Sequence, residues 1–264
     1  MTQTRGRGEP PTLGILMIDS VATFLPGGVA SASSYGGPVT YLRIPGATGD
    51  RVIGGDPELT ASFVEGAREL VRRGAEAITS NCGFVALYQP AIATAVRVPV
   101  FVSSLLQVPL VVAMLAPGQR VGILTYDAAQ LSRRHFEACG WDPDRIQVAV
   151  AGVRGLPEWA VISAPEAEID PDAMRDDLVS VGRQLLASTE NIGALVLECT
   201  AMCPFAPDLQ ARLGLPVFDL NSLIHTMLRA IRHPRYSGVV APPREAGISL
   251  TRIRGAVTEA AAAR

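Results

Sequence analysis

The sequence predicts an α/β fold made of two pseudo-symmetric α/β halves, each a short parallel sheet flanked by helices, with the active site in the cleft between them. Two observations lead to this fold class. Short apolar runs alternate with longer amphipathic stretches along the 264 residues, which is the pattern of parallel strands covered by helices. In addition, one set of motifs occurs twice in the chain, each time around a cysteine.

The repeat is centred on Cys82 and Cys199. A proline follows each cysteine by eight residues, and an apolar-Pro-Val-Phe sequence begins sixteen residues after each. Each copy also opens with Gly-Ile-Leu, at Gly14 and Gly122, and carries an aspartate five residues after that glycine. Two related half-molecules that each offer one thiol from a matching loop would form a cleft with a reactive group on either wall.

The predicted strands are short apolar runs bounded by polar or turn residues. They cover residues 13–18, 77–79, 98–102, 120–124, 147–151, 194–197 and 215–218. Both cysteines, together with Asp19 and Asp127, follow the end of a strand. Because ligands of open parallel sheets bind beyond the carboxyl ends of the strands, we expect these four residues to face one cleft.

Helices are predicted where apolar residues recur at helical spacing between start and stop signals. Residues 56–73 begin with an acidic residue and a proline and stop at Gly74, and residues 171–188 have Asp170 as the expected N-cap. A last helix covers residues 219–232, with Asn221 or Ser222 as its cap. The apolar stretch 96–117 contains an arginine and prolines, so we interpret it as a strand, a loop and a helix and not as a membrane span.

The repeat divides the chain into a first half over residues 12–116 and a second half over residues 117–218. The helix over 219–232 is expected to pack back on the first half. The remainder, residues 233–264, is rich in proline and glycine before an alanine tract, and we expect partial disorder there.

Composition excludes several classes of function. A net charge of -2 without basic clusters argues against nucleic acid and anionic membranes as partners. The chain contains no lysine, which excludes a Schiff-base mechanism and a P-loop. A small-molecule partner is therefore expected.

The four cysteines do not form the pattern of a disulfide framework, and no signal peptide is evident, so we expect a cytoplasmic protein. Three scattered histidines and one Cys-x-x-x-Cys do not supply a metal site. We expect neither a metal nor a cofactor.

A cysteine that precedes a helix start receives backbone N–H groups, which favour the thiolate and lower the thiol pKa. Two such cysteines on opposite sides of one carbon can act as base and acid, so that its configuration inverts without a cofactor. The amides of Gly83, Phe84, Thr200 and Ala201 are candidate donors for the charge that develops on the substrate oxygen.

The paired cysteines, the Ile18-Asp19-Ser20 turn and the Asn81-Cys82 and Glu198-Cys199-Thr200 loops resemble the cofactor-independent aspartate/glutamate racemase superfamily. That group includes hydantoin racemases, arylmalonate decarboxylases and maleate cis-trans isomerases. The resemblance covers about residues 12–228, and the tandem half-repeat is also a property of the superfamily.

The resemblance implies that Cys82 and Cys199 are the two acid/base thiols. It also implies a set of substrate-binding residues, formed by Asp19, Ser20, Asn81, Gly83, Phe84, Thr125, Thr200 and Ala201. Among them, Asp19 matches an aspartate that assists catalysis in glutamate racemases. Dimers are common among such enzymes, which makes a homo-oligomer an expectation.

The sequence departs from the family pattern at Ala201, where glutamate racemases place histidine and aspartate racemases glutamate. An apolar residue there is closer to hydantoin racemases. We therefore expect a racemase or epimerase that acts on an amino acid or an amino-acid derivative, hydantoin-like or related. The expected partner is a small-molecule carboxylate or an amino-acid-like substrate.

Three alternatives remain open. A maleate-type cis-trans isomerase or an arylmalonate-type decarboxylase would act on a small dicarboxylic acid, although arylmalonate decarboxylases keep only the second cysteine. A non-catalytic small-molecule binding protein would also place two α/β halves around a cleft, because one fold hosts many functions.

Overall fold

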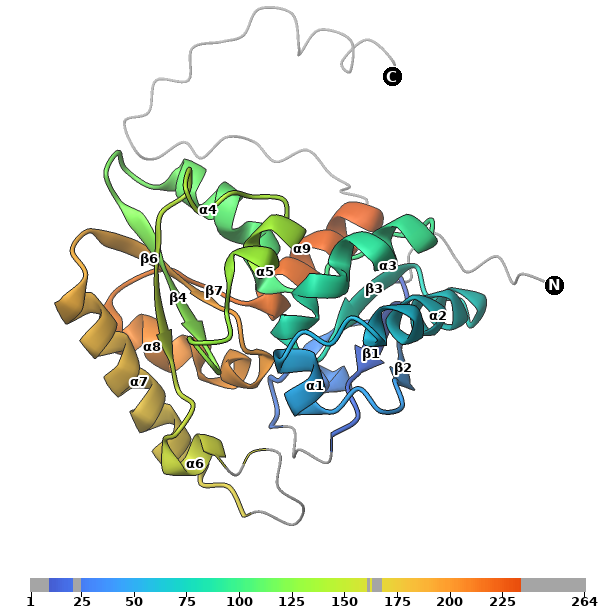
Figure 1. Ribbon diagram of the computed structural model, residues 1–264, viewed down its shortest axis with the longest axis horizontal. Coiled ribbons are helices and arrows are strands. Elements are labelled where there is room, and N and C mark those ends of the chain that lie inside the picture. Colours follow the sequence, from blue (N-terminus) through green and yellow to red (C-terminus); the bar gives the residue numbers. More distant parts are fainter. Residues whose placement is uncertain (1–9, 21–24, 161, 163–167, 234–264) are drawn as a thin grey trace, which may run out of the picture. The chain divides into compact units, whose positions relative to one another are not determined.

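The structure is a computed structural model that describes residues 10–20, 25–160, 162 and 168–233, which lie in one compact unit ending at His233. Its first sheet has three parallel strands in the order β2-β1-β3 (Figure 1). These are β1 (Leu13–Met17), β2 (Val39–Arg43) and β3 (Ala77–Ser80). The predicted disordered tail lies outside the described residues, apart from His233.

The second sheet has four parallel strands in the order β5-β4-β6-β7. They are β4 (Arg120–Thr125), β5 (Val148–Gly152), β6 (Ile192–Leu197) and β7 (Val217–Phe218). Two parallel sheets with flanking helices confirm the predicted α/β fold class.

The sequence repeat corresponds to a repeat in strand register. Gly14 in β1 pairs with Ile78, as Gly122 in β4 pairs with Leu195, and both partners lie four residues before a cysteine. Ile78 in turn forms a single parallel bridge with Val100, as Leu195 pairs with Val217. The two halves therefore repeat the same pairing, and both cysteines lie beyond the same edge of their sheets.

The helices of the first half are α1 (Gly49–Ile53), α2 (Leu59–Arg72), α3 (Gln89–Ala95) and α4 (Val108–Met114). Those of the second half are α5 (Arg133–Ala138), α6 (Pro157–Ala160), α7 (Pro171–Ser188) and α8 (Ala206–Leu213). The chain continues into α9 (Leu220–Ile231). Short 3-10 helices cover Ala32–Ser34 (η1), Gly83–Tyr88 (η2), Ser104–Gln107 (η3) and Thr200–Phe205 (η4).

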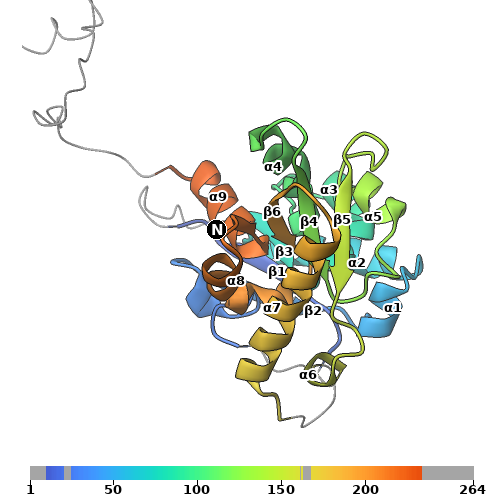
Figure 2. The same cartoon turned by 90° about the vertical axis from the view of Figure 1, so that its left-hand side faces the viewer.

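Three hydrophobic clusters hold this unit together. The largest joins Ile78 of the first sheet to Ile123 and Val196 of the second. A second cluster packs α7 and α8 on the outer face of the second sheet, where Figure 2 shows α7 running along the strands. In the third, α9 packs its apolar face on β1 and β3.

Several predicted elements differ from the structure. Residues 98–102 form no strand but only the bridge at Val100. The cap of α9 is Asp219, whose side chain accepts a hydrogen bond from the Ser222 amide at 2.7 Å, and not Asn221 or Ser222. The strand β2 was not predicted, because its five residues are all partly or fully exposed and show no apolar run.

No helix among the described residues is both long enough and apolar enough to cross a membrane.

Candidate active site

Cys82 and Cys199 hold equivalent places in the two halves. Each is the N-cap of a 3-10 helix, Cys82 of η2 after β3 and Cys199 of η4 after β6. The α-helices that follow, α3 and α8, both have a proline in their first turn. The repeated local sequence thus builds the same strand, cysteine and turn twice.

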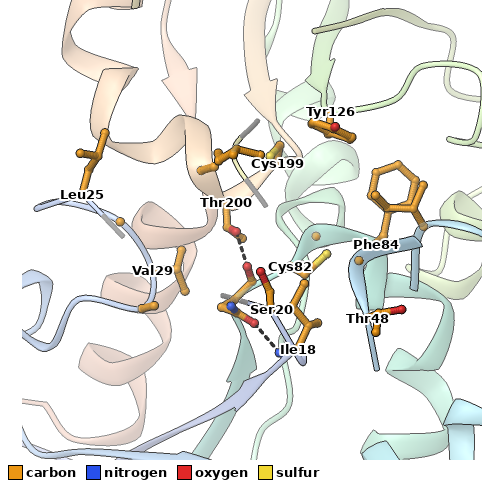
Figure 3. Close-up of a pocket in the computed structure, with 18 of the residues that line it drawn as sticks. Ile18, Ser20, Leu25, Val29, Thr48, Cys82, Phe84, Tyr126, Cys199 and Thr200 are labelled. Atoms are coloured by element: carbon orange, nitrogen blue, oxygen red, sulfur yellow. Dashed lines mark hydrogen bonds between the residues drawn. The ribbon is translucent and has the colours of Figure 1, made fainter. Parts of the chain in front are cut away.

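A cavity of about 570 Å³ contains both cysteines and draws its lining from both halves. Nine of the ten predicted site residues line it, namely Asp19, Ser20, Asn81, Cys82, Gly83, Phe84, Cys199, Thr200 and Ala201. In the view of Figure 3, Phe84 and Tyr126 lie on one side of the two sulfur atoms, and Leu25 and Val29 on the other.

Neither thiol has the lowered pKa that the turn geometry predicts. Burial, and after it the nearby Glu198 carboxyl, raise the pKa of Cys82 to about 12, against the opposing effect of the Phe84 and Val85 amides. Burial likewise raises the pKa of Cys199, with Glu198 as the next cause, against the amides of Ala201 and Met202. The amides do point at the sulfur atoms, but desolvation outweighs them.

Asp19 borders the cavity as a fixed carboxylate. Its Oδ1 accepts a hydrogen bond from Arg43 Nη1 at 3.2 Å, and its Oδ2 accepts one from the Gly46 amide at 2.9 Å. These donors, the Gly46 amide first, hold the pKa of Asp19 below its usual value. Asp19 is therefore an ionised carboxylate at the border of the cavity, paired on its outer side with Arg43.

Asn81 and Thr200 connect the two cysteine loops. The Thr200 hydroxyl donates to the Asn81 carbonyl oxygen, and Asn81 Oδ1 accepts from the Ile18 amide at 2.8 Å (Figure 3). The Thr200 bond joins the loop of one half to the loop of the other, and the Ile18 bond holds Asn81 against the end of β1.

Thr125 is the predicted site residue that does not line the cavity. It is fully buried, and its hydroxyl donates to Glu198 Oε2 at 2.7 Å. Its role as a substrate ligand stays a prediction, while its observed contact is with Glu198.

One expectation about the cleft is wrong. Asp127 does not line the cavity, because its carboxylate pairs with Arg154 and accepts from the Ala129 amide at 3.0 Å. Asp19 and Asp127 are therefore equivalent in sequence spacing but not in surroundings.

The structure also adds lining residues that the sequence did not reveal. Thr48 and Asp50 come from the start of α1, which was not predicted, and Tyr126 follows β4 directly. The strand-end position of Tyr126 between Thr125 and Asp127 was a signal that could have identified it. Among the described residues, no group of three His, Cys, Asp or Glu side chains could hold a metal ion.

Residues 104–228 match the family described as Asp/Glu/Hydantoin racemase. This stretch, a little under half of the chain, is similar to the Asp/Glu/Hydantoin racemase family. The match contains Cys199 and the whole of the second half, and the first half repeats the same strand register around Cys82.

Solved structures of the superfamily share the fold. An allantoin racemase from Klebsiella pneumoniae aligns with a TM-score of 0.57 at 17% identity, over 88% of this chain and 96% of that chain. Unliganded arylmalonate decarboxylase aligns with a TM-score of 0.54 at 17% identity, over 88% and 96%. A glutamate racemase from Bacillus anthracis gives 0.54 at 16% identity, over 83% and 82%.

Among curated proteins, one of Durusdinium sp. clade D is 29% identical over 232 residues, 85% of this chain and 77% of that protein. It is named dimethylsulfoniopropionate lyase. Dimethylsulfoniopropionate lyase 7 of Emiliania huxleyi (strain CCMP1516) is 27% identical over 238 residues, 86% of this chain and 70% of that protein. The two relatives are thus named as lyases, whereas the three solved structures are named as racemases and a decarboxylase.

Proposed function

We propose that this protein is a cofactor-independent lyase that eliminates a sulfide from a small β-sulfonio carboxylate, with dimethylsulfoniopropionate as the type substrate. A thiolate of the cysteine pair removes the proton next to the carboxylate. The observation that carries the proposal is the charge of the cavity that holds the two thiols.

The described lining of the cavity contains two carboxylates, Asp19 and Asp50, and no arginine or histidine. It also contains the rings of Phe84 and Tyr126, whose faces attract cations. No described lining residue is cationic, so none of them balances the second negative charge of a dicarboxylate. Acidic and aromatic groups beside the thiols instead favour a substrate that carries a positive charge as well as a carboxylate.

The elimination balances without any co-reactant. The thiolate takes the proton from the α carbon, and the electron pair of that C–H bond forms the double bond between the α and β carbons. The bond from the β carbon to sulfur breaks, and its electron pair neutralises the sulfonium. The products are acrylate and dimethyl sulfide, and the base has become a thiol.

The cysteine loops supply the groups that this step needs. The amides of the η2 and η4 turns point at the thiols and favour the thiolate that removes the proton. Thr48 lines the same cavity. The relatives named dimethylsulfoniopropionate lyase, similar over most of the chain, support the same reaction class.

The test is release of dimethyl sulfide from dimethylsulfoniopropionate, measured by headspace gas chromatography with acrylate measured in solution. We expect equal amounts of both products from the purified chain. Absence of both products, from protein that circular dichroism shows to be folded, would overturn the lyase proposal.

A racemase or epimerase of an amino acid or amino-acid derivative is the second candidate, favoured by the equivalent placement of the two thiols. Inversion needs a base on one face of the α carbon and an acid on the other, whereas elimination needs one base. Incubation in deuterium oxide with amino acids and hydantoins distinguishes the two. Deuterium at the α carbon with inversion, and no dimethyl sulfide from the sulfonium substrate, would favour the racemase.

A further inference from the structure

Glu198 is a fully buried acid placed behind the wall of the cavity. It directly precedes Cys199, it does not line the cavity, and none of its surface is exposed. In the repeat it is equivalent to Asn81, the residue before Cys82. The two have matching backbone bonds, from the Asn81 amide to Leu16 O at 3.2 Å and from the Glu198 amide to Leu124 O at 2.7 Å. The second half thus carries an ionisable group where the first has a neutral amide.

The carboxyl of Glu198 is held between the two cysteine loops. Oε2 accepts the hydrogen bond from Thr125, while Oε1 has no hydrogen-bond partner among the described residues. On the Oε1 side lies Gly83, where a β-carbon would come within 2.8 Å of the Glu198 carboxyl carbon and closer still to Oε1. The open oxygen of Glu198 is therefore directed at the residue that follows Cys82.

Three thiols are electrostatically coupled to Glu198. Cys199 lies next to it in the chain, Cys82 comes from the opposite loop, and Cys139 comes from the end of α5. The Glu198 charge raises the pKa of all three. Burial raises the pKa of Glu198 itself to about 7, against the opposing effect of the Thr125 hydroxyl. Glu198 therefore loses its proton before the thiols of the pair.

We propose that Glu198 is a positioning residue whose charge controls when the thiols of Cys82 and Cys199 ionise. While Glu198 is neutral, thiolate increases with pH as for any thiol. Once Glu198 is ionised, its carboxylate opposes a second negative charge in the same buried space, and the thiolate population stops increasing. The inference rests on the cysteine acid/base chemistry of the proposed function, but it holds for a lyase and for a racemase.

The test needs no substrate. Alkylation by iodoacetamide reports thiolate, and mass spectrometry of the derived peptides separates Cys82 from Cys199. For the native chain we expect the logarithm of each alkylation rate to increase with pH and to level off above about pH 7, because coupled groups titrate together. For Glu198→Gln the increase should continue, so that at pH 9 the variant reacts at least about tenfold faster, relative to its rate at pH 6, than the native chain.

Glu190→Gln is the matched control, because Glu190 is an exposed acid just before β6. It should keep the native profile. Parallel profiles for native and Glu198→Gln at every pH would overturn the proposal. If Glu198→Gln does not fold, Thr125→Val gives a second test. Loss of the Thr125 hydrogen bond raises the pKa of Glu198, so the break, the pH at which the alkylation rate levels off, should move to higher pH. An unmoved break in folded Thr125→Val would also overturn it.

The two proposals fail separately. A chain that releases no dimethyl sulfide but shows the break in thiol reactivity contradicts the lyase alone. A chain that releases dimethyl sulfide but alkylates with no break contradicts the role of Glu198 alone.

Discussion

Gly83 and Glu198 are in contact across the cleft wall, and no larger residue fits at position 83 without movement. A β-carbon on Gly83 would overlap the carbonyl oxygen and the carboxyl group of Glu198. The absence of a side chain at Gly83 therefore lets the two cysteine loops approach each other, with the Glu198 carboxyl buried between them.

Replacement of Gly83 by alanine is expected to destabilise the fold. The added methyl group must displace backbone of the opposite loop, and overpacking of this kind costs about 1–3 kcal/mol of unfolding free energy. Urea denaturation measures the difference. Gly36→Ala is the control, because a β-carbon at Gly36 meets nothing within 4 Å and should leave stability nearly unchanged. Equal effects of the two substitutions would contradict the close packing at Gly83.

Tyr126 should contribute through its ring and not through its hydroxyl if the substrate carries a sulfonium. Tyr126→Leu removes the aromatic face from the cavity wall and should raise KM, by about 2- to 30-fold for a cation–π contact of about 0.5–2 kcal/mol. Tyr126→Phe keeps the face and should retain a KM close to the native value. Initial rates of dimethyl sulfide release over a range of substrate concentrations measure both. Equal KM values for the Leu and Phe variants would argue against a cation at this wall.

The ionisation of Glu198 should weaken the fold as pH rises. Its pKa is about 7 in the folded chain, above the ordinary 4.5, so the folded state binds more protons between these values and stability falls as pH increases through them. The span corresponds to about 3 kcal/mol, as an order of magnitude. Glu198→Gln should therefore gain stability relative to the native chain by about that amount between pH 4.5 and pH 7.5.

Thermal or urea unfolding at several pH values measures this gain, with Glu190→Gln as the exposed control. If the difference in unfolding free energy between the native chain and Glu198→Gln is the same at all pH values, ionisation of Glu198 does not destabilise the fold, which would contradict this prediction.

The two halves and the cysteine loops could be predicted from the sequence, because both copies of the repeat keep the same number of residues between motifs. Equal spacing within each copy places equivalent residues opposite each other in the two sheets. Ile78 and Leu195 pair with equivalent glycines for this reason. The edge strand β2 escaped prediction because partial exposure leaves it without an apolar run.

Side-chain direction could not be predicted in the same way. Asp19 and Asp127 share a position in the repeat, yet Asp127 turns to Arg154 and to the amides of its own turn. Glu198 was visible only as the neighbour of Cys199. Its burial against Gly83 depends on how the two halves pack, which spacing along one chain does not specify.

The central claim is that the two thiols in the cavity carry the reaction, and the rate of dimethyl sulfide release from Cys82→Ser and Cys199→Ser tests it most directly. A serine hydroxyl is a far weaker acid than a thiol, so loss of the acid/base group should lower kcat by about 10²- to 10⁴-fold in at least one of the two variants. Cys139→Ala, outside the cavity, serves as the control for loss of a cysteine. Native rates in both serine variants would contradict the account.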